Sequence, residues 1–176
     1  MGGDSPSAEE SLSPDPALIR IALVFAGVYA LLQATLWYVG SLGWLEPTLT
    51  VTAGITGALS NLTGVPATVI GNEVHLSSRI LRMDPACTAI PLAILYTALV
   101  LAYPLSMWKR TIGTLVGLLL LFLANFVRLT AVAQLSAPLA DDTFMFVHDY
   151  LFMIAMIAVV IGLWAAYLAW ARRSVR

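Results

Sequence analysis

The chain has 176 residues, of which 60% are hydrophobic and only 11% are charged, and its formal net charge is −1. A soluble domain usually carries about 25% charged residues, so this composition indicates an integral membrane protein, and the near-neutral charge does not support nucleic-acid binding. A single cysteine excludes an internal disulfide, and no metal-binding or nucleotide-binding motif is present, so we expect no cofactor and no metal ion.

Residues 1–16 are polar and rich in serine, proline and acidic residues, which predicts a disordered tail. Residues 17–39 follow, with a single charge, Arg20, near their start. This stretch is long enough to cross a membrane, which takes about 20 residues. The sequence therefore predicts a first membrane span directly after the tail.

The next segment is a long loop, residues 40–86, with two features of its own. Residues 48–63 are apolar and rich in threonine and glycine but short for a span, so we expect an interfacial or re-entrant helix. If they did cross, the chain would have five spans. Further along, the β-prone runs 67–70 and 73–76 flank Gly71-Asn72, which predicts a β-hairpin.

Three more apolar segments complete the pattern, at residues 87–108, 111–135 and 148–171. Only Lys109 and Arg110 interrupt the second and third spans, so we expect a tight helical hairpin there. The predicted fold is an all-α integral membrane protein. It is a four-span helix bundle whose outer-face loop carries the short interfacial helix and the β-hairpin.

The placement of basic residues predicts the orientation of this bundle. The side with both tails holds Arg20, Lys109, Arg110, Arg172, Arg173 and Arg176, and the other side holds Arg79 and Arg82. The side richer in basic residues is cytoplasmic by the positive-inside rule. We therefore expect a disordered cytoplasmic tail over 1–16, one transmembrane domain over 17–171 and a basic cytoplasmic tail over 172–176.

The only cysteine, Cys87, stands at the start of the second span. Asp84 and Pro85 before it are typical of an N-cap and a first helical residue, which puts Cys87 in the first turn. The positive end of a helix dipole lowers a thiol pKa and favours the thiolate. Pro91 predicts that the helix is either kinked or begins later. The alternative is a small, buried and inert cysteine.

Two further residues lie at a similar outer depth on the third and fourth spans. Arg128 is a charge inside a span and thus a functional candidate, with Asn125 on the same helix face as a supporting residue. Its alternative is an arginine that extends toward the outer headgroups. His148 opens the fourth span and is otherwise an ordinary interfacial histidine. Asp141 and Asp142 either orient it or cap the helix.

Together these three residues form a pattern that is typical of an activated thiol. His148 can accept the thiol proton as general base and later protonate a leaving amine as general acid. Arg128 can stabilise an oxyanion or the thiolate, because its guanidinium stays charged. We therefore predict that Cys87 is a nucleophile, Arg128 its stabilising cation and His148 its general acid/base.

Gly113 and Gly117 form a GxxxG pattern in the third span. Glycines at this spacing let helices approach closely inside a membrane. We expect a packing face here, rather than a part of the active site.

Three motifs, in this order, resemble those of the exosortase/archaeosortase family of membrane-embedded cysteine transpeptidases. Residues 84–90 (DPACTAI) look like its cysteine motif, 125–128 (NFVR) like its arginine motif and 148–150 (HDY) like its histidine motif. The resemblance covers about residues 55–165. Thr88-Ala89 stand where the family commonly has Ser-Gly, and the chain looks like a reduced-core member, because many members carry more spans.

The resemblance implies a protein-sorting enzyme in the plasma membrane of a bacterium or archaeon, with its active site at the outer face. Its substrates would be secreted proteins that end in a short motif, a transmembrane helix and a basic cluster. Cys87 would attack the carbonyl near that motif, form a thioester and release the helix. A lipid amine, another amine or water would then resolve the thioester, and membrane lipids would be further partners.

Two other functions stay open at this point. An intramembrane cysteine hydrolase would use the same residues and cut the tail without transferring it. A non-catalytic membrane assembly factor or transporter subunit would need none of them. A free carboxylate on the product distinguishes the first, and unchanged processing in a Cys87→Ser variant distinguishes the second.

Overall fold

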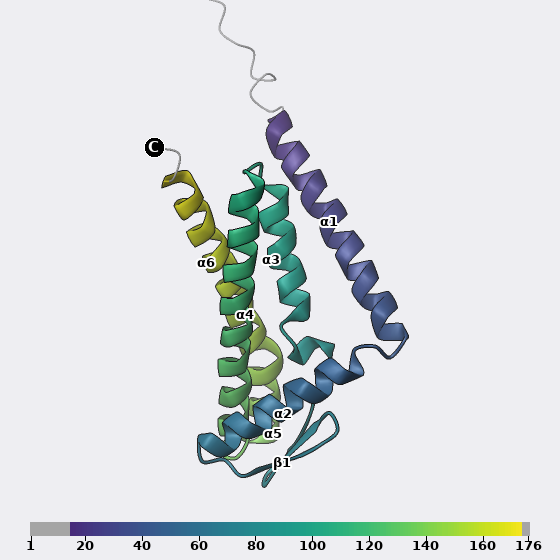
Figure 1. Cartoon of the computed structure of the whole chain (residues 1–176). Helices are drawn as coiled ribbons and strands as arrows, with labels where there is room; N and C mark the ends of the chain where they lie inside the picture. Colours follow the sequence, from purple (N-terminus) through teal and green to yellow (C-terminus); the bar gives the residue numbers. More distant parts are fainter. Residues whose placement is uncertain (1–14, 174–176) are drawn as a thin grey trace, which may run out of the picture.

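The computed structural model describes residues 15–173, which form a helical bundle with a small sheet at one end (Figure 1). The predicted tail over 1–16 lies almost wholly outside the described residues, as do residues 174–176. The helical elements are α1 (Pro16–Ser41), α2 (Glu46–Leu62), α3 (Ile90–Ala102), α4 (Met107–Leu135), α5 (Asp141–Phe146) and α6 (Phe152–Arg173), with the short turns η1 (Pro85–Cys87) and η2 (Val147–Leu151). The strands are β1 (Ala67–Ile70), β2 (Glu73–Leu76) and β3 (Ile80–Arg82).

Three helices are long and apolar enough to cross a membrane: α1, α4 and the continuous stretch Asp141–Arg173. α2, the three strands and α3 lie between the first and second of these helices, and most residues are helical, so the predicted all-α integral membrane architecture is confirmed. The last of the three merges α5, η2 and α6 into one helix of 33 residues. It therefore begins before the predicted span at 148–171.

The second predicted span, 87–108, contains a shorter helix than expected. α3 has 13 residues, which is about 20 Å at 1.5 Å per residue, against a hydrocarbon core of about 30 Å. Proline limits it at both ends, with Pro91 in its first turn and Pro104 just after the extended residue Tyr103. The helix begins late, which was one of the two outcomes predicted from Pro91. A crossing by this segment stays a prediction.

The antiparallel α3–α4 hairpin is confirmed, but its turn lies earlier than predicted. Residues 103–106 form the connection, whereas Lys109 and Arg110 belong to the first turns of α4. The physical reason is Pro104, which ends α3 and lets the next helix begin at Met107.

The predicted short helix is present as α2, and Figure 1 shows it crossing the end of the bundle that carries the sheet. Its buried face carries Thr52, Thr56 and Ser60. Each of these hydroxyls donates to the carbonyl four residues earlier, at 2.8 Å, so the polar groups are satisfied within the helix. α2 can therefore pack against α4 and the sheet despite its polar composition.

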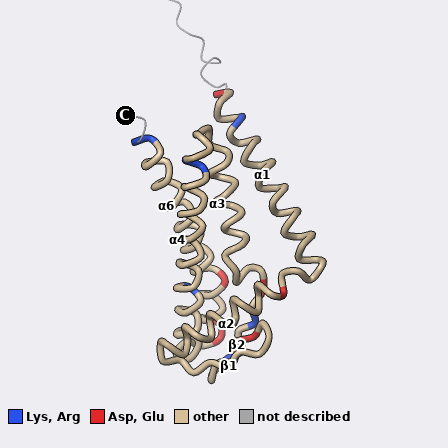
Figure 2. Tube along the Cα trace, viewed as in Figure 1, with Lys and Arg blue, Asp and Glu red and all other residues tan. Residues whose placement is uncertain are grey.

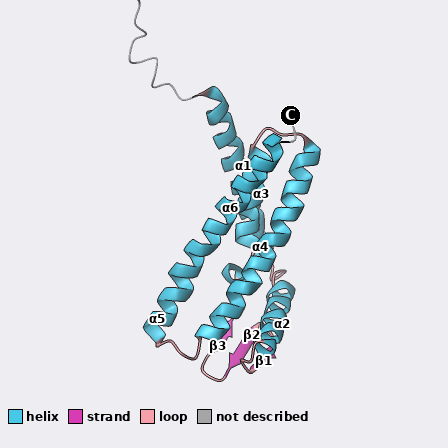
Figure 3. Cartoon of the chain, turned by 90° about the vertical axis from the view of Figure 1, so that its left-hand side faces the viewer, coloured by secondary structure: helices cyan, strands magenta, loops and turns pink. Residues whose placement is uncertain are grey.

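The predicted hairpin is confirmed, with β1 and β2 antiparallel and Ile70 opposite Glu73 across the Gly71-Asn72 turn. Gly71 adopts φ 60°, a conformation that suits glycine. A third strand, β3, pairs with β2 and was not predicted. Figure 3 shows this sheet at the end of the bundle far from the C-terminus. Asn72 also makes two hydrogen bonds to Met83: its carbonyl accepts from the Met83 N–H at 2.8 Å, and its side-chain amide donates to the Met83 carbonyl at 3.1 Å. The turn therefore holds the segment that leads to Cys87.

Candidate active site

Cys87 ends a single 3₁₀ turn, η1, between β3 and α3. The Asp84 carboxylate accepts a hydrogen bond from the Cys87 backbone N–H at 3.0 Å, and Pro85 follows the cap, as predicted. The Thr88 hydroxyl donates to the Pro85 carbonyl at 2.7 Å and closes the turn. The side chain of Cys87 is buried, at 6% exposure, in the cluster of apolar residues under the sheet.

The protonation of this thiol differs from the prediction. Burial raises the pKa of Cys87 above its usual value, and the negative charge of Asp84 acts in the same direction. A backbone hydrogen bond from Asp84 and the charge of Arg128 lower the pKa, but they do not outweigh burial. The expected lowering by a helix dipole was wrong, because α3 begins only at Ile90 and the thiol lies inside the apolar cluster. The resting group is therefore the neutral thiol.

Asn125 and Arg128 on α4 connect to the turn that carries Cys87. The Asn125 amide donates to the Cys87 carbonyl at 3.0 Å, and Asn125 itself is only 2% exposed. Arg128 donates through Nη1 to the Asn125 side-chain oxygen at 3.2 Å and to the Ala86 carbonyl at 3.5 Å. The shared helix face of the two residues is confirmed, and the guanidinium points to the cysteine turn.

The Nε of Arg128 is buried and has no hydrogen-bond partner among the described residues. A buried guanidinium donor without a partner is costly, unless another group supplies an acceptor. Arg128 thus places a cation beside the cysteine turn, and this cation has one hydrogen-bond donor that is not used. An oxyanion is the kind of group that such a donor stabilises.

His148 lies in η2, a π-helical turn within the last long helix. Its Nδ1 is 2.8 Å from an Asp149 carboxylate oxygen, and its ring stacks on Phe144 with centroids 5.9 Å apart. A carboxylate accepts hydrogen bonds, so Nδ1 is the donor and Nε2 keeps its lone pair for a proton. Among the described residues, His148 bonds Asp149 rather than Asp141 or Asp142. Asp141 pairs with Arg79, and both aspartates lie in the first turn of α5, where acidic residues favour the helix dipole.

Arg79, between β2 and β3, is a residue whose place at the site the sequence did not predict. Its guanidinium forms an ion pair with Asp141 at 2.8 Å and donates to the Leu139 carbonyl at 2.7 Å. It also lies 4.1 Å from the centre of the Phe144 ring, the same ring that stacks on His148. Arg79 therefore links the sheet before Cys87 to the helix that carries His148.

The structure brings together three of the four predicted residues and leaves one apart. Hydrogen bonds join the Cys87 turn, Asn125 and Arg128, whereas within residues 15–173 no hydrogen bond or ion pair connects His148 to Cys87 or Arg128. In the same part of the chain, no three His, Cys, Asp or Glu side chains gather to hold a metal ion. The arrangement is a buried thiol and a cation on one side, and a histidine–carboxylate pair on the other.

These features define a membrane-embedded helical protein with a cysteine-based polar site where its sheet meets the bundle. The chain matches the family described as Transmembrane exosortase (Exosortase_EpsH) over residues 14–165, and it therefore belongs to the exosortase family. This membership supports a membrane protein-sorting enzyme and, in general terms, a cysteine transpeptidase. The comparisons with curated proteins and with solved structures gave no match.

Proposed function

We propose that this protein cleaves the C-terminal sorting signal of secreted proteins and transfers them, through a thioester on Cys87, to an amine-bearing acceptor in the membrane or at the surface. The observation that carries the proposal is a chain of two hydrogen bonds: Asn125 donates to the Cys87 carbonyl, and Arg128 donates to Asn125. A lone inert cysteine has no need of a buried amide on its carbonyl and a cation beside it. Family membership supports the same chemistry.

In the first half-reaction, His148 Nε2 takes the proton of the Cys87 thiol, whose raised pKa makes a base necessary. The thiolate attacks the scissile carbonyl carbon, and Arg128 stabilises the resulting oxyanion. The peptide C–N bond then breaks, and His148 gives its proton to the leaving amine. The products are an acyl thioester and the released C-terminal helix.

In the second half-reaction, the acceptor amine attacks the thioester carbonyl while His148 removes its proton. The C–S bond breaks, an amide forms and the proton returns to the cysteine. Both proton transfers need His148 Nε2 within about 3 Å of the reacting atom. Because no hydrogen bond links His148 to Cys87 in the described residues, we propose that substrate binding draws η2 toward η1.

The substrates in this proposal are secreted proteins that carry a short motif, a transmembrane helix and a basic cluster at the C-terminus. Enzyme and substrate are then confined to the same membrane, which raises their effective concentration. The acceptor is a lipid amine or a surface amine.

We further propose four spans, in which the segment 87–108 crosses as the second, with α3 as its helical part. Figure 2 shows that the basic residues at the start of α1, the start of α4 and the end of α6 share one end of the bundle. The positive-inside rule assigns that end to the cytoplasm. Cys87 then faces the outer side of the plasma membrane of a bacterium or archaeon.

The test is a processing assay with a substrate that carries such a signal. A Cys87→Ala variant should yield no shortened product, whereas wild-type protein should yield a product whose new C-terminus is joined to an amine. Normal processing by Cys87→Ala contradicts the role of the thiol. A free carboxylate on the wild-type product contradicts transfer and leaves hydrolysis.

A further inference from the structure

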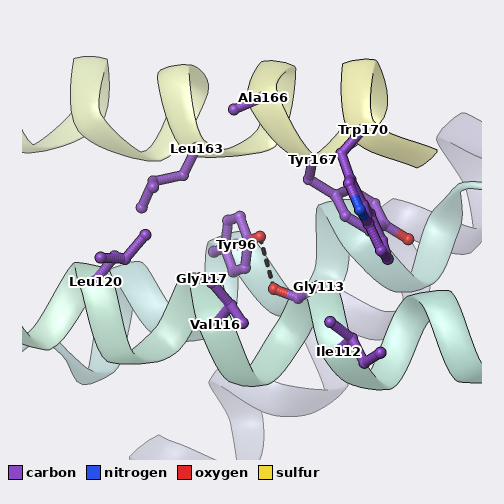
Figure 4. Close-up of a pocket in the computed structure, with 10 residues that line it drawn as sticks. All are labelled: Tyr96, Ile112, Gly113, Val116, Gly117, Leu120, Leu163, Ala166, Tyr167 and Trp170. Carbon is purple, nitrogen blue, oxygen red and sulfur yellow. Dashed lines mark hydrogen bonds between the residues drawn. The ribbon is translucent and has the colours of Figure 1, made fainter. Parts of the chain in front are cut away.

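A cavity lies between α4 and α6, away from the cysteine turn and toward the end where α4 begins and α6 ends. Its volume is about 310 Å³. Figure 4 shows the residues that line it, which include Tyr96, Gly113, Gly117, Leu163, Tyr167 and Trp170. This volume is at the lower end of the range of ligand pockets, about 300–1,000 Å³.

The GxxxG pattern predicted as a packing face helps to form this cavity. Tyr96 packs on Gly117 and Tyr167 on Gly113, where any larger side chain would collide with the rings. The Tyr96 hydroxyl donates to the Gly113 carbonyl at 2.9 Å, so it is satisfied. Val116 and Leu120 on the cavity wall are 52% and 44% exposed, so the cavity opens sideways from the bundle.

One end of the cavity carries a hydrogen-bond donor that the protein leaves unused. Tyr167 is only 5% exposed, and its hydroxyl has no partner among the described residues. Figure 4 shows this hydroxyl at the end of the cavity nearest the start of α4. Arg110, in the first turns of α4, does not line the cavity, but its charge acts on Tyr167, and its Nε is also buried without a partner among the described residues. Unpaired buried donors are destabilising, unless a ligand accepts from them.

We propose that this cavity binds an anionic phospholipid. The phosphate accepts a hydrogen bond from the Tyr167 hydroxyl, the charge of Arg110 near that hydroxyl attracts the phosphate, and one acyl chain occupies the apolar cavity. Lys109, Arg172 and Arg173 lie at the same end of the bundle and add positive charge.

Other occupants fit less well. A partner helix has its backbone polar groups bonded internally and would present apolar side chains here, so it would leave the Tyr167 hydroxyl unpaired. A free phosphate ion would leave the apolar wall without contacts. The lipid site does not depend on the proposed sorting activity.

The test is native mass spectrometry of the full-length, delipidated protein during titration with phosphatidylglycerol. Arg110→Gln and Tyr167→Phe should each weaken binding by about tenfold or more, since the first removes a charge near the phosphate and the second a hydrogen bond to it. Ala166→Trp, which places a large ring on the cavity wall, should abolish binding. Arg82→Gln and Tyr38→Phe, two exposed residues of matching types that lie away from this end of the bundle, serve as controls and should bind as the wild type does.

A thermal-unfolding scan without lipid separates binding from misfolding. Tyr167→Phe should be at least as stable as the wild type, because it removes an unsatisfied hydroxyl. Equal affinity of all variants contradicts the site. Diacylglycerol binding as tightly as phosphatidylglycerol contradicts recognition of phosphate, and displacement by a synthetic transmembrane peptide contradicts the choice of lipid.

Discussion

The two sides of the candidate active site are built differently. On the α4 side, Asn125 and Arg128 are hydrogen-bonded to the cysteine turn across 38 or more residues of sequence. On the other side, the His148 side chain bonds its neighbour Asp149 and no other residue within 15–173, and it stacks on Phe144. Nucleophile and cation are therefore preorganised, while the base is held separately. This difference suits an enzyme whose buried thiol is activated only when a substrate brings both sides together.

The largest expected effect comes from removing His148, the base that is held apart from the cysteine turn. His148→Ala should lower the processing rate by about 10³-fold, because general acid–base catalysis contributes about 10²–10⁴-fold. The melting temperature should not change, since the hydrogen bond that His148 makes among the described residues stays within its own helix. A processing time course with His75→Ala as the control measures this. A rate equal to that of the wild type would show that another group moves the proton.

The next largest effect is expected from removing Arg128, the cation that is hydrogen-bonded to the cysteine turn. Arg128→Ala should lower the rate by about 10²-fold, the usual cost of one oxyanion donor. Arg128→Lys should rescue little, because lysine lacks the planar set of donors. The matched control is Arg82→Ala, an exposed arginine in β3. Full activity of Arg128→Lys would indicate that only charge matters.

Asn125→Leu should affect stability as well as rate, unlike His148→Ala. It leaves the Cys87 carbonyl and one donor of Arg128 unpaired, which costs about 1–3 kcal/mol of unfolding free energy. Thr130→Val on the same helix removes a hydroxyl bonded only within α4 and serves as the control. The measurement is thermal unfolding in detergent. An unchanged melting temperature would mean that the α4 side is not fixed by this amide.

A smaller effect is expected from Arg79, which acts through Phe144 on His148. Arg79→Met should lower the rate about fivefold, since an exposed to partly buried cation–π contact contributes about 0.5–2 kcal/mol. A processing time course measures this rate, and Arg82→Met is the control. A rate equal to that of the wild type would remove Arg79 from the positioning of His148.

The smallest effect concerns the pH dependence of thiol alkylation. Because the pKa of Cys87 is raised, iodoacetamide labelling should increase only at a pH above that of an ordinary thiol. Asp84→Asn keeps a capping side chain but removes a charge that raises the pKa, so its labelling curve should move to lower pH. An identical curve for Asp84→Asn would contradict the influence of that carboxylate.

The raised pKa also has a consequence for stability. A group whose folded-state pKa exceeds its unfolded value contributes stability below the unfolded pKa. That contribution is lost as pH rises through the folded value, so burial of Cys87 should make the protein less stable at alkaline pH.

Local signals in the sequence predicted much of this structure. The turn at Gly71-Asn72 predicted its hairpin, and the Asp84-Pro85 pair predicted the cap on the cysteine turn. The missed features depend on contacts between distant segments. β3 exists because it pairs with β2, the thiol pKa rises because the apolar cluster buries Cys87, and Arg79 reaches Asp141 across 62 positions of sequence.

The proposed mechanism requires that Cys87 forms an acyl-enzyme with its substrate. This intermediate is detected by the intact mass of the protein after brief incubation with a substrate and rapid acid quench. We expect an added mass equal to the substrate without its C-terminal helix, attached to Cys87, released by hydroxylamine and absent from Cys87→Ala. A shortened product that forms without any adduct on Cys87, or an adduct that persists in Cys87→Ala, would contradict it.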